Sequence, residues 1–316
     1  MLTPMSAEKL LEIGYCCGLK CKNCPFFPRY EKGSRIIANN KMSNNKVLVV
    51  GESCNDIFIY GNASRLCPDV PAPVLVPKDS VDTPGMAGNT ARNLRSLGLE
   101  VDLIRQQEMI KKTRYIDSKL NYTFLRVDEG EDRITPLSRC SSLRYGSKAE
   151  HPNGIIDEEE IRAYDAVVIS DYGKGFLSES DIEKFCKNNA NTFLDTKKIL
   201  GDYCREAKII KINSPEFESI KGNIHLDDWR DRLIVTLGDR GRMYYKERGF
   251  HYYDVESVDV FDLSGAGDTF LAALVAKYLE TNNMEDAIKY ANKKSAEVVQ
   301  KKGVSVIYKS ESKKAK

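Results

Sequence analysis

A carboxylate stands directly behind two glycines at the start of an apolar segment near the end of the sequence. Asp268 follows Gly265, Ala266 and Gly267 and precedes the apolar run 270–279. Small residues let backbone N–H groups approach a ligand, and the first turn of a helix carries unpaired N–H groups and partial positive charge. This suits a phosphoryl group in transfer, and Asp268 is placed to take a proton from an attacking hydroxyl. The alternative is an aspartate that only caps a helix behind turn glycines.

These residues need elements that bring them together, and strand-like runs alternate with helix-like runs along most of the chain. Such alternation predicts an α/β fold with a mostly parallel sheet and helices on both faces. Ligands bind beyond the carboxyl ends of such strands, so Asp171, Asn213 and Gly238, which directly follow predicted strands, should lie at one edge. Ser178 and Ser214 are the expected N-caps of two helices. The predicted strands are 46–51, 101–104, 166–169, 192–195, 208–212 and 233–237, and the predicted helices are 86–97, 178–187, 214–220, 266–280 and 284–301.

Further strands are predicted outside this alternation. Polar and apolar residues mix in 111–117 and 122–127, which suits a sheet with one solvated face. Together with the segment 60–77, these strands would form a small lid sheet over the carboxyl edge. The runs 243–246 and 250–253 are typical of a hairpin.

The composition excludes several classes of protein. The chain has 316 residues, of which 41% are hydrophobic and 30% charged, which is enough for one large domain with a core. A net charge of +2 argues against a nucleic-acid partner, and no apolar run approaches the roughly 18 residues of a membrane span. Nine cysteines without a secretory signal favour reduced thiols in the cytoplasm. The three histidines stand in no recognisable catalytic setting.

Several short motifs, in order along the chain, resemble those of the ribokinase/PfkB family of sugar kinases. They are Gly51 through Asp56, Pro-Gly-Met-Ala-Gly-Asn at 84–89, Asn-x-x-Glu at 213–216, Thr-x-Gly-x-x-Gly at 236–241 and Asp-x-x-Gly-Ala-Gly-Asp at 262–268. Within the family, the chain resembles in particular the kinases of D-glycero-β-D-manno-heptose 7-phosphate, on segments 60–74, 112–114, 125–128 and 170–175. The resemblance runs from about residue 46 to 307. It implies a ribokinase-like fold with a β lid, and the use of ATP and Mg²⁺ to phosphorylate a sugar hydroxyl.

The resemblance also implies roles for individual residues on the ATP side. Asp268 would be the catalytic base, and the amides of Gly265, Ala266 and Gly267 would form the anion hole. The residues that would hold the nucleotide and its Mg²⁺ are Asn213, Glu216, Thr236, Gly238, Gly241 and Asn292. By position alone, the Asn-x-x-Glu pair fits a helix cap equally well. Gly238 and Gly241 fit an ordinary hairpin turn, and Asn292 fits a solvated helix face.

The acceptor-side residues that the resemblance implies are Asp56, Gly85, Gly88 and Asn89. The candidate cations for an acceptor phosphate are Lys112, Arg114, Arg126 and Lys174. Carboxylate and amide groups bind sugar hydroxyls, and arginine is the better fork for a phosphate. Strand alternation places Lys112 and Arg114 on one face of their strand and Lys111 on the other. A solvated strand face is the alternative interpretation of this charged run.

Three departures from the family pattern leave the acceptor open. The chain has Gly51-Glu52 where the family usually has Gly-Asp, and Gly85-Met86 where it has Gly-Gly, so Met86 is expected to crowd or reshape the pocket. Residues 106–109 lead straight to the lid strand, where the heptose-kinase relatives carry a further strand and helix. The alternatives are a kinase of another sugar, sugar phosphate or nucleoside, and a non-catalytic sugar or nucleotide sensor.

The predicted domains are a cysteine-rich unit at 1–37, a linker at 38–45, a kinase domain at 46–308 and a disordered tail at 309–316. The first unit resembles a small bacterial domain of unknown function. Its cysteines are Cys16, Cys17, Cys21 and Cys24. They include a Cys-x-x-Cys pair typical of zinc sites, and a reduced structural cluster is the alternative. The expected partner is a small-molecule sugar or sugar phosphate rather than a nucleic acid or membrane, and a homodimer through the lid sheet is left open.

Overall fold

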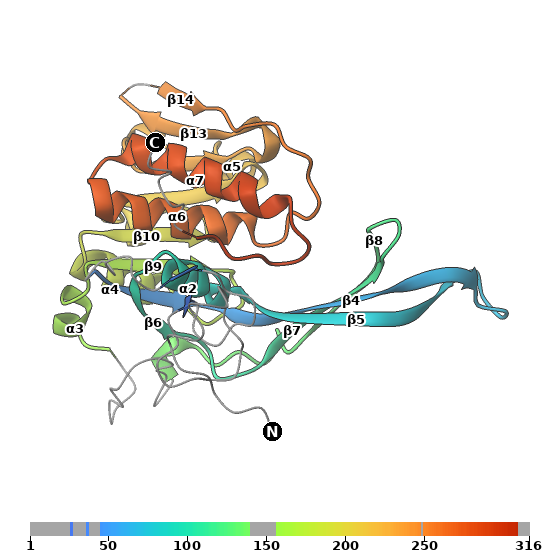
Figure 1. Cartoon of the computed structure of the whole chain (residues 1–316). Coiled ribbons are helices and arrows are strands. Elements are labelled where there is room, and N and C mark those ends of the chain that lie inside the picture. Colours follow the sequence, from blue (N-terminus) through green and yellow to red (C-terminus); the bar gives the residue numbers. More distant parts are fainter. Residues whose placement is uncertain (1–25, 28–35, 38–44, 140–155, 248, 309–316) are drawn as a thin grey trace.

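The computed structural model describes residues 26–27, 36–37, 45–139, 156–247 and 249–308. In this part of the chain a sheet of eight strands forms the body, and a sheet of four strands projects from it (Figure 1). Two short strands, β1 (Phe26–Phe27) and β2 (Ile36–Ile37), form a separate antiparallel pair. The four cysteines of the N-terminal unit and the predicted tail lie outside the described residues.

The large sheet has the strand order β14-β13-β12-β11-β10-β9-β3-β6. Neighbours from β12 to β6 run parallel, whereas β13 and β14 are antiparallel additions at one side. The strands are β3 (Lys46–Gly51), β6 (Glu100–Ile104), β9 (Ala166–Asp171), β10 (Thr192–Thr196), β11 (Ile209–Asn213), β12 (Leu233–Thr236), β13 (Arg242–Lys246) and β14 (Gly249–Tyr253). The mostly parallel sheet predicted from the sequence is therefore confirmed.

Helices cover both faces of this sheet, because its strands are apolar on both sides. Leu48 of β3 packs in one buried cluster with Phe185, while the next residue, Val49, packs in another with Phe270. The helices of the first face are α3 (Glu158–Arg162), α4 (Glu179–Asn188) and α5 (Ser214–Ile220), and those of the second are α2 (Ala87–Ser96), α6 (Ala266–Thr281) and α7 (Met284–Val299) (Figure 1). No helix in the described ranges is long and apolar enough to cross a membrane.

The carboxyl ends of the parallel strands line up at one edge, as predicted. Asp171 at the end of β9 is in register with Thr196 at the end of β10, and Asn213 of β11 is in register with Thr236 of β12. Four short 3₁₀ turns accompany these strands: Leu137–Arg139, Asp202–Cys204, Leu226–Trp229 and Gly238–Arg240. The last of them follows β12, so Gly238 also lies at this edge.

The projecting sheet is larger than predicted. Its strands are β4 (Ser53–Leu66), β5 (Pro73–Met86), β7 (Ile110–Asp117) and β8 (Tyr122–Glu129), in the order β5-β4-β7-β8. Only Glu52 separates the core strand β3 from β4, so the hairpin of β4 and β5 is connected to the large sheet through a single residue (Figure 1). Asp56 therefore lies within a lid strand, five residues beyond the end of β3 at Gly51.

The helix starts follow their local sequence signals with one exception. Ser178 caps α4 through a capping box with Asp181, as predicted. The N-cap of α5 is Asn213 and not Ser214: the Asn213 side chain accepts a hydrogen bond from the backbone N–H of Glu216. Both residues can cap a helix. Because β11 ends at Asn213 and α5 begins at Ser214, Asn213 is the residue between them, and the N-cap lies one residue earlier than predicted.

Candidate active site

The Gly-Ala-Gly-Asp turn opens helix α6 at the carboxyl edge of the large sheet. Gly265 has φ of 77°, a conformation that favours glycine, and a Cβ atom there would come within 2.6 Å of Asn89 Nδ2. Asp268 lies in the first turn of α6 with only 4% of its surface exposed. The turn therefore presents its backbone to the edge while it buries the carboxylate beside it.

Two side chains from distant segments hold the Asp268 carboxylate. Asn89 Nδ2, in the first turn of α2, donates to Oδ2 over 3.1 Å. The Tyr172 hydroxyl, in the loop after β9, donates to Oδ1 over 2.7 Å. Tyr172 was not singled out from the sequence, although it stands in the motif 170–175 that carried part of the resemblance. Asn89 was expected to contact the acceptor, and here its amide contacts the predicted base.

The surroundings of Asp268 tune its protonation. Burial raises the pKa of the Asp268 carboxyl to about 6, against the opposing effect of the hydrogen bonds from Asn89 and Tyr172. Asp195 raises this pKa further, and Lys211 lowers it. A carboxyl group with a pKa of about 6 is ionised at neutral pH and is a stronger base than an exposed aspartate.

We expect kcat/KM to fall on the acid side of the pH profile with an apparent pKa near 6, since only ionised Asp268 can accept a proton. The measurement is the initial rate at limiting acceptor between pH 5 and 9 at constant ionic strength. A phosphate on the acceptor titrates in the same range, so acceptor binding is measured at each pH as the control. A rate that stays constant down to pH 5 would contradict the assignment.

A buried lysine lies beside the Gly-Ala-Gly-Asp turn. Lys211 of β11 is 5% exposed, and its Nζ makes a 2.6 Å ion pair with Asp195 of β10. A Cβ atom on Gly267 would come within 3.3 Å of this Nζ, so the ammonium group lies against the backbone of the turn. Lys211 was not singled out from the sequence, although a single lysine within the apolar run 209–212 was an available signal, because lysine is rarely buried unless it is paired.

On the acceptor side, Asp56 and Arg114 form a close pair between neighbouring lid strands. Arg114 Nη1 lies 2.5 Å from Asp56 Oδ1, and the guanidinium group stacks on the ring of Phe58 at 5.0 Å. Gly85 lies so close that a Cβ atom there would be 2.0 Å from Asp56 Oδ2. A Cβ on Gly88 would likewise meet Ser53 Oγ at 2.4 Å. Gly85 therefore leaves room for the Asp56 side chain between β4 and β5, and Gly88 permits the close approach of β4 to α2.

The other predicted cations also lie on the lid or the adjoining loop, and each has a carboxylate partner. Glu131 joins two of them: Lys112 Nζ lies 3.3 Å from one of its oxygens, and Lys174 Nζ lies 2.5 Å from the other. Arg126 makes a two-pronged contact with Asp128 at 2.7 and 2.8 Å. Strand register confirms that Arg114 and Arg126 are neighbours. Lys112 is buried and Lys111 exposed, as predicted, while Thr113 between Lys112 and Arg114 is buried as well.

On the nucleotide side, Asn213 and Glu216 bond mainly to each other. They form a capping box, in which the backbone N–H of Asn213 also donates to Glu216 Oε2 over 2.7 Å, and Lys197 pairs with Glu216 Oε1. The capping interpretation is therefore realised, while the metal role stays a prediction. No group of three or more His, Cys, Asp or Glu side chains within the described ranges is arranged to hold a metal ion.

The remaining nucleotide-side residues shape the turn after β12. Arg242 is buried and donates to the carbonyl oxygens of Gly238 and Gly241 over 3.1 and 2.7 Å, which closes the turn. Thr236 lies at the strand end, where its hydroxyl faces the Ile212 carbonyl at 3.4 Å. Together these contacts fix the shape of the loop that was predicted to meet the nucleotide.

Asn292 of α7 is 4% exposed, so the alternative of a solvated helix position was wrong. Its side-chain N–H groups donate to the backbone oxygens of Tyr253 and Asp254 over 3.2 and 3.1 Å. Asn292 therefore fastens the chain after β14 to α7.

Met86 adopts a backbone conformation that favours glycine. It has φ of 58° and ψ of −134° at the N-cap of α2, which is costly for a residue with a side chain. Its side chain is buried in a cluster with Cys54 and Ile110, and Tyr172 packs against that cluster. Met86 is therefore part of the apolar cluster against which Tyr172 packs, and its effect on the acceptor pocket stays a prediction.

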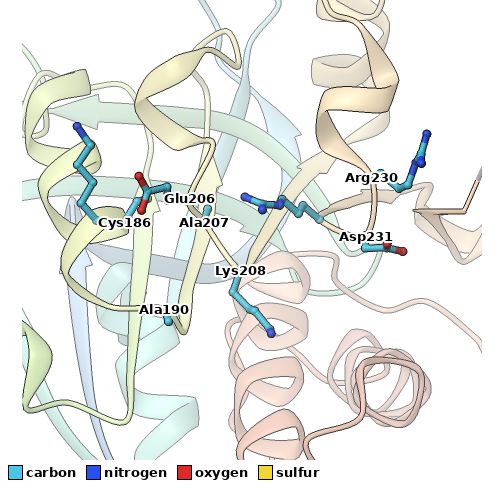
Figure 2. A pocket seen from close by; sticks show the side chains of 9 residues that line it. Cys186, Ala190, Glu206, Ala207, Lys208, Arg230 and Asp231 are labelled. Atoms are coloured by element: carbon cyan, nitrogen blue, oxygen red, sulfur yellow. The ribbon is translucent and has the colours of Figure 1, made fainter.

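A separate pocket of about 570 Å³ lies at the amino ends of β10, β11 and β12, opposite to the predicted site (Figure 2). Lys208 directly precedes β11, and Arg232 directly precedes β12. The charged lining residues are Lys187, Glu206, Lys208, Arg230, Asp231 and Arg232. None of the residues predicted for catalysis or binding lines this pocket, so the candidate active site is the carboxyl edge.

Known proteins of similar sequence are carbohydrate kinases. Residues 178–310 match the family described as pfkB family carbohydrate kinase. A D-beta-D-heptose 7-phosphate kinase of Bordetella bronchiseptica is 28% identical over 296 residues, which cover 84% of this chain and 95% of that protein. The bifunctional protein HldE of Vibrio vulnificus is also 28% identical, and the chain spans 62% of its length.

Solved structures show the same fold at low sequence identity. A nucleoside kinase of Methanocaldococcus jannaschii, described as an archaeal member of the ribokinase family, has a TM-score of 0.59 and 17% identity, over 83% of this chain and 94% of that chain. A ribokinase of Thermotoga maritima has a TM-score of 0.59 and 16% identity, over 82% and 94%. The described fold is therefore ribokinase-like, as predicted.

The fold is ribokinase-like, and a buried carboxylate lies at the start of helix α6 at its carboxyl edge. Residues 178–310 carry a pfkB family carbohydrate kinase domain, and together with the kinase relatives this match makes the enzyme an ATP-dependent carbohydrate kinase.

Proposed function

We propose that this kinase transfers the terminal phosphoryl group of ATP to a hydroxyl of a heptose 7-phosphate. The observation that carries the transfer reaction is the buried Asp268 at the start of α6, with two donors on its carboxylate and the Lys211 ammonium beside the turn. The similarity to a heptose 7-phosphate kinase supports the choice of acceptor. The cations Lys112, Arg114 and Lys174 support it further, since a phosphorylated sugar needs positive charge.

The residues of the chain divide the work of the transfer. Asp268 accepts the proton of the attacking hydroxyl, and its pKa of about 6 keeps it ionised at neutral pH. The amides of 265–267, at the start of α6, and the Lys211 ammonium stabilise the charge that develops on the phosphoryl oxygens. Arg114 and Lys112 orient the acceptor through its own phosphate.

A magnesium ion belongs to the same proposal. Asn213 and Glu216 bring oxygen atoms to the carboxyl edge, and Glu216 keeps 17% of its side chain exposed. Because these oxygens also serve the capping box, they fit a hydrated ion held through water, which is how Mg²⁺ is usually bound. The chemistry that Mg²⁺ supplies when bound is neutralisation of charge on the nucleotide phosphates.

The decisive experiment is ATP consumption measured against a panel of heptose, hexose and pentose sugars, their phosphates, and nucleosides. We expect the highest kcat/KM with a heptose 7-phosphate. An unphosphorylated sugar or a nucleoside as the best acceptor would overturn the choice of substrate. Nucleotide binding without turnover on any acceptor would instead favour the sensor function.

Dimer formation through the lid and a cytoplasmic location complete the proposal. Leu66, Val76 and Leu125, on three lid strands, are 63%, 54% and 55% exposed, and their burial against a second chain would favour association. We expect analytical ultracentrifugation to show a dimer that Val76→Glu with Leu125→Glu converts to a monomer. A monomeric parent protein would contradict the dimer.

The cysteines of the described part, Cys54, Cys67, Cys186 and Cys204, are free thiols, which suits the reducing cytoplasm.

We further propose that the cysteine-rich N-terminal unit is separable from the kinase domain. Every residue of the site described above lies after Lys46. A protein that begins at Met42 should therefore fold and keep the full kcat, and zinc analysis should find about one metal ion per full-length chain and none in the shortened one. Cys21→Ser with Cys24→Ser is the matched variant of the full chain and should lose the metal. Loss of activity on truncation would show that the two units depend on each other.

A further inference from the structure

We propose that Glu52 and Tyr172 are positioning residues of this kinase: Glu52 clamps the loop 172–176, and the hydroxyl of Tyr172 in that loop holds Asp268 in its reactive orientation. This inference rests on the proposed role of Asp268 as the base. It gives a task to two residues that neither the motifs nor the family match explain. One is the glutamate that departs from the usual Gly-Asp pattern, and the other is the tyrosine after β9.

The clamp is a fully buried carboxylate bound by three backbone amides. Glu52 has 0% exposure, and its Oε2 accepts from the N–H of Tyr172 over 2.8 Å. Its Oε1 accepts from the N–H groups of Lys174 and Phe176 over 3.1 and 3.2 Å. Hydrogen bonds from N–H groups to a carboxylate are about twice as strong as those between neutral groups. Glu52, directly after the core strand β3, therefore fixes the backbone of the loop to the body.

The fixed loop places the Tyr172 side chain between charged groups from two directions. Lys112 Nζ of the lid lies 5.8 Å from the ring centre, and Lys197 Nζ, just after β10, lies 5.5 Å from it. Such cation–ring contacts favour one orientation of the ring. Burial and the nearby Asp268 raise the pKa of the phenol well above its ordinary value, so Tyr172 remains a donor at all working pH values.

The hydroxyl of Tyr172 and the amide of Asn89 occupy one lone pair on each Asp268 oxygen. An ionised carboxylate has about four acceptor sites, so lone pairs remain for the proton of an attacking hydroxyl. With both oxygens held, the carboxylate cannot rotate, and its free lone pairs keep one direction. Orientation of this kind is where positioning contributes most to rate.

The same hydrogen bond lowers the pKa of Asp268, so its removal has a signature in the pH profile. The charged and titratable groups around Asp268 are Lys211 of β11, Asp195 of β10, Lys197 after β10, Cys54 of β4 and Tyr172 itself. Of these, Tyr172 donates directly to the carboxylate. Without its hydroxyl the ionised form is less stabilised, the pKa rises, and the acid limb moves to higher pH.

The loop also connects the base to the lid. Lys174, two residues after Tyr172, pairs with Glu131, which in turn pairs with Lys112 of β7. One clamp at Glu52 therefore positions both the donor to the base and a cation on the acceptor side. A weakened clamp should affect kcat through Tyr172 and the acceptor KM through Lys174, whereas loss of the Tyr172 hydroxyl alone should affect kcat.

The test compares Tyr172→Phe with the parent enzyme. We expect kcat to fall about tenfold or more, the acid limb to move up by about one pH unit, and KM for ATP to stay unchanged. An acceptor phosphate titrates in the same way in the assays of the variant and of the parent enzyme. A difference between their acid limbs therefore reports a change in the pKa of an enzyme group. Tyr164→Phe is the matched control, because Tyr164 makes a similar buried bond to Asp102 over 2.8 Å at the amino edge. It should leave kcat and the limb unchanged.

Glu52→Gln provides the second arm, since an amide retains the shape but cannot accept all three N–H bonds. It should reproduce the shift of the acid limb and also raise the acceptor KM, and its combination with Tyr172→Phe should lower kcat no further than the larger single effect. Parent-like kcat and pH profile in Tyr172→Phe would overturn the inference. If Asp268→Asn were active as well, the base assignment itself would fail; an inactive Asp268→Asn beside a normal Tyr172→Phe would overturn the positioning role alone.

Discussion

Replacing Asp268 with asparagine should lower kcat by at least about 100-fold, the usual contribution of a positioned base, and leave ATP affinity nearly unchanged. The substitution preserves the size of the side chain, and an amide oxygen can still accept from Asn89. What is lost is the ability to accept a proton. The measurement is kcat with the best acceptor of the panel, together with the dissociation constant for ATP.

Thermal unfolding separates this loss from a loss of structure. The folded-state pKa of Asp268, about 6, lies above its ordinary value of 3.8, so the cost of the buried charge grows as pH rises from 3.8 to 6 and is complete above 6. A neutral asparagine should therefore raise the free energy of unfolding at pH 7.5 by about 1–3 kcal/mol, an advantage that shrinks as pH falls below 6 and is lost only below pH 3.8. A variant that is more stable and inactive would identify Asp268 as functional, whereas near-normal turnover would falsify the base assignment.

Replacing Arg114 with alanine should raise KM for a phosphorylated acceptor by about 10- to 100-fold, with KM for ATP spared. Arg114 is a planar cation of the lid, and a lost contact between a guanidinium group and a phosphate has an effect of this order. Its removal also leaves Asp56 without its ion pair at 2.5 Å, so an unpaired carboxylate would then face the acceptor. Both constants should be measured with the same acceptor.

The matched control is Lys111→Ala, three residues earlier on β7. Lys111 is exposed on the opposite face of the strand. The substitution therefore removes a positive charge from the lid but leaves the charges of the candidate site in place. We expect unchanged constants for this variant. Equal effects of both substitutions would mean that the lid attracts the acceptor by its general charge. No effect of Arg114→Ala, with an unphosphorylated sugar as the best substrate, would refute the heptose phosphate proposal.

Local signals in the sequence determined much of the fold and the centre of the site. The turn before α6 needs glycine at position 265, and the carboxylate in its first turn follows from residues that are neighbours in the chain. The apolar strand runs and the Ser178 capping box placed β9 and α4 for the same reason. The alternation of Lys111 and Lys112 across β7 was readable because it depends only on the pleat of a strand.

The partners of these residues were decided by the tertiary structure. Tyr172 meets Asp268 across 96 residues, and Glu52 meets the Tyr172 amide across 120, so no local pattern connects them. The register between β4 and β7, which pairs Asp56 with Lys112 and places Arg114 beside Phe58, likewise exists only once the lid has formed. Sequence spacing could indicate which groups are able to do chemistry. The pKa of Asp268 and the orientation of its carboxylate depend on burial and on donors from other segments, and these arise only when the chain is folded.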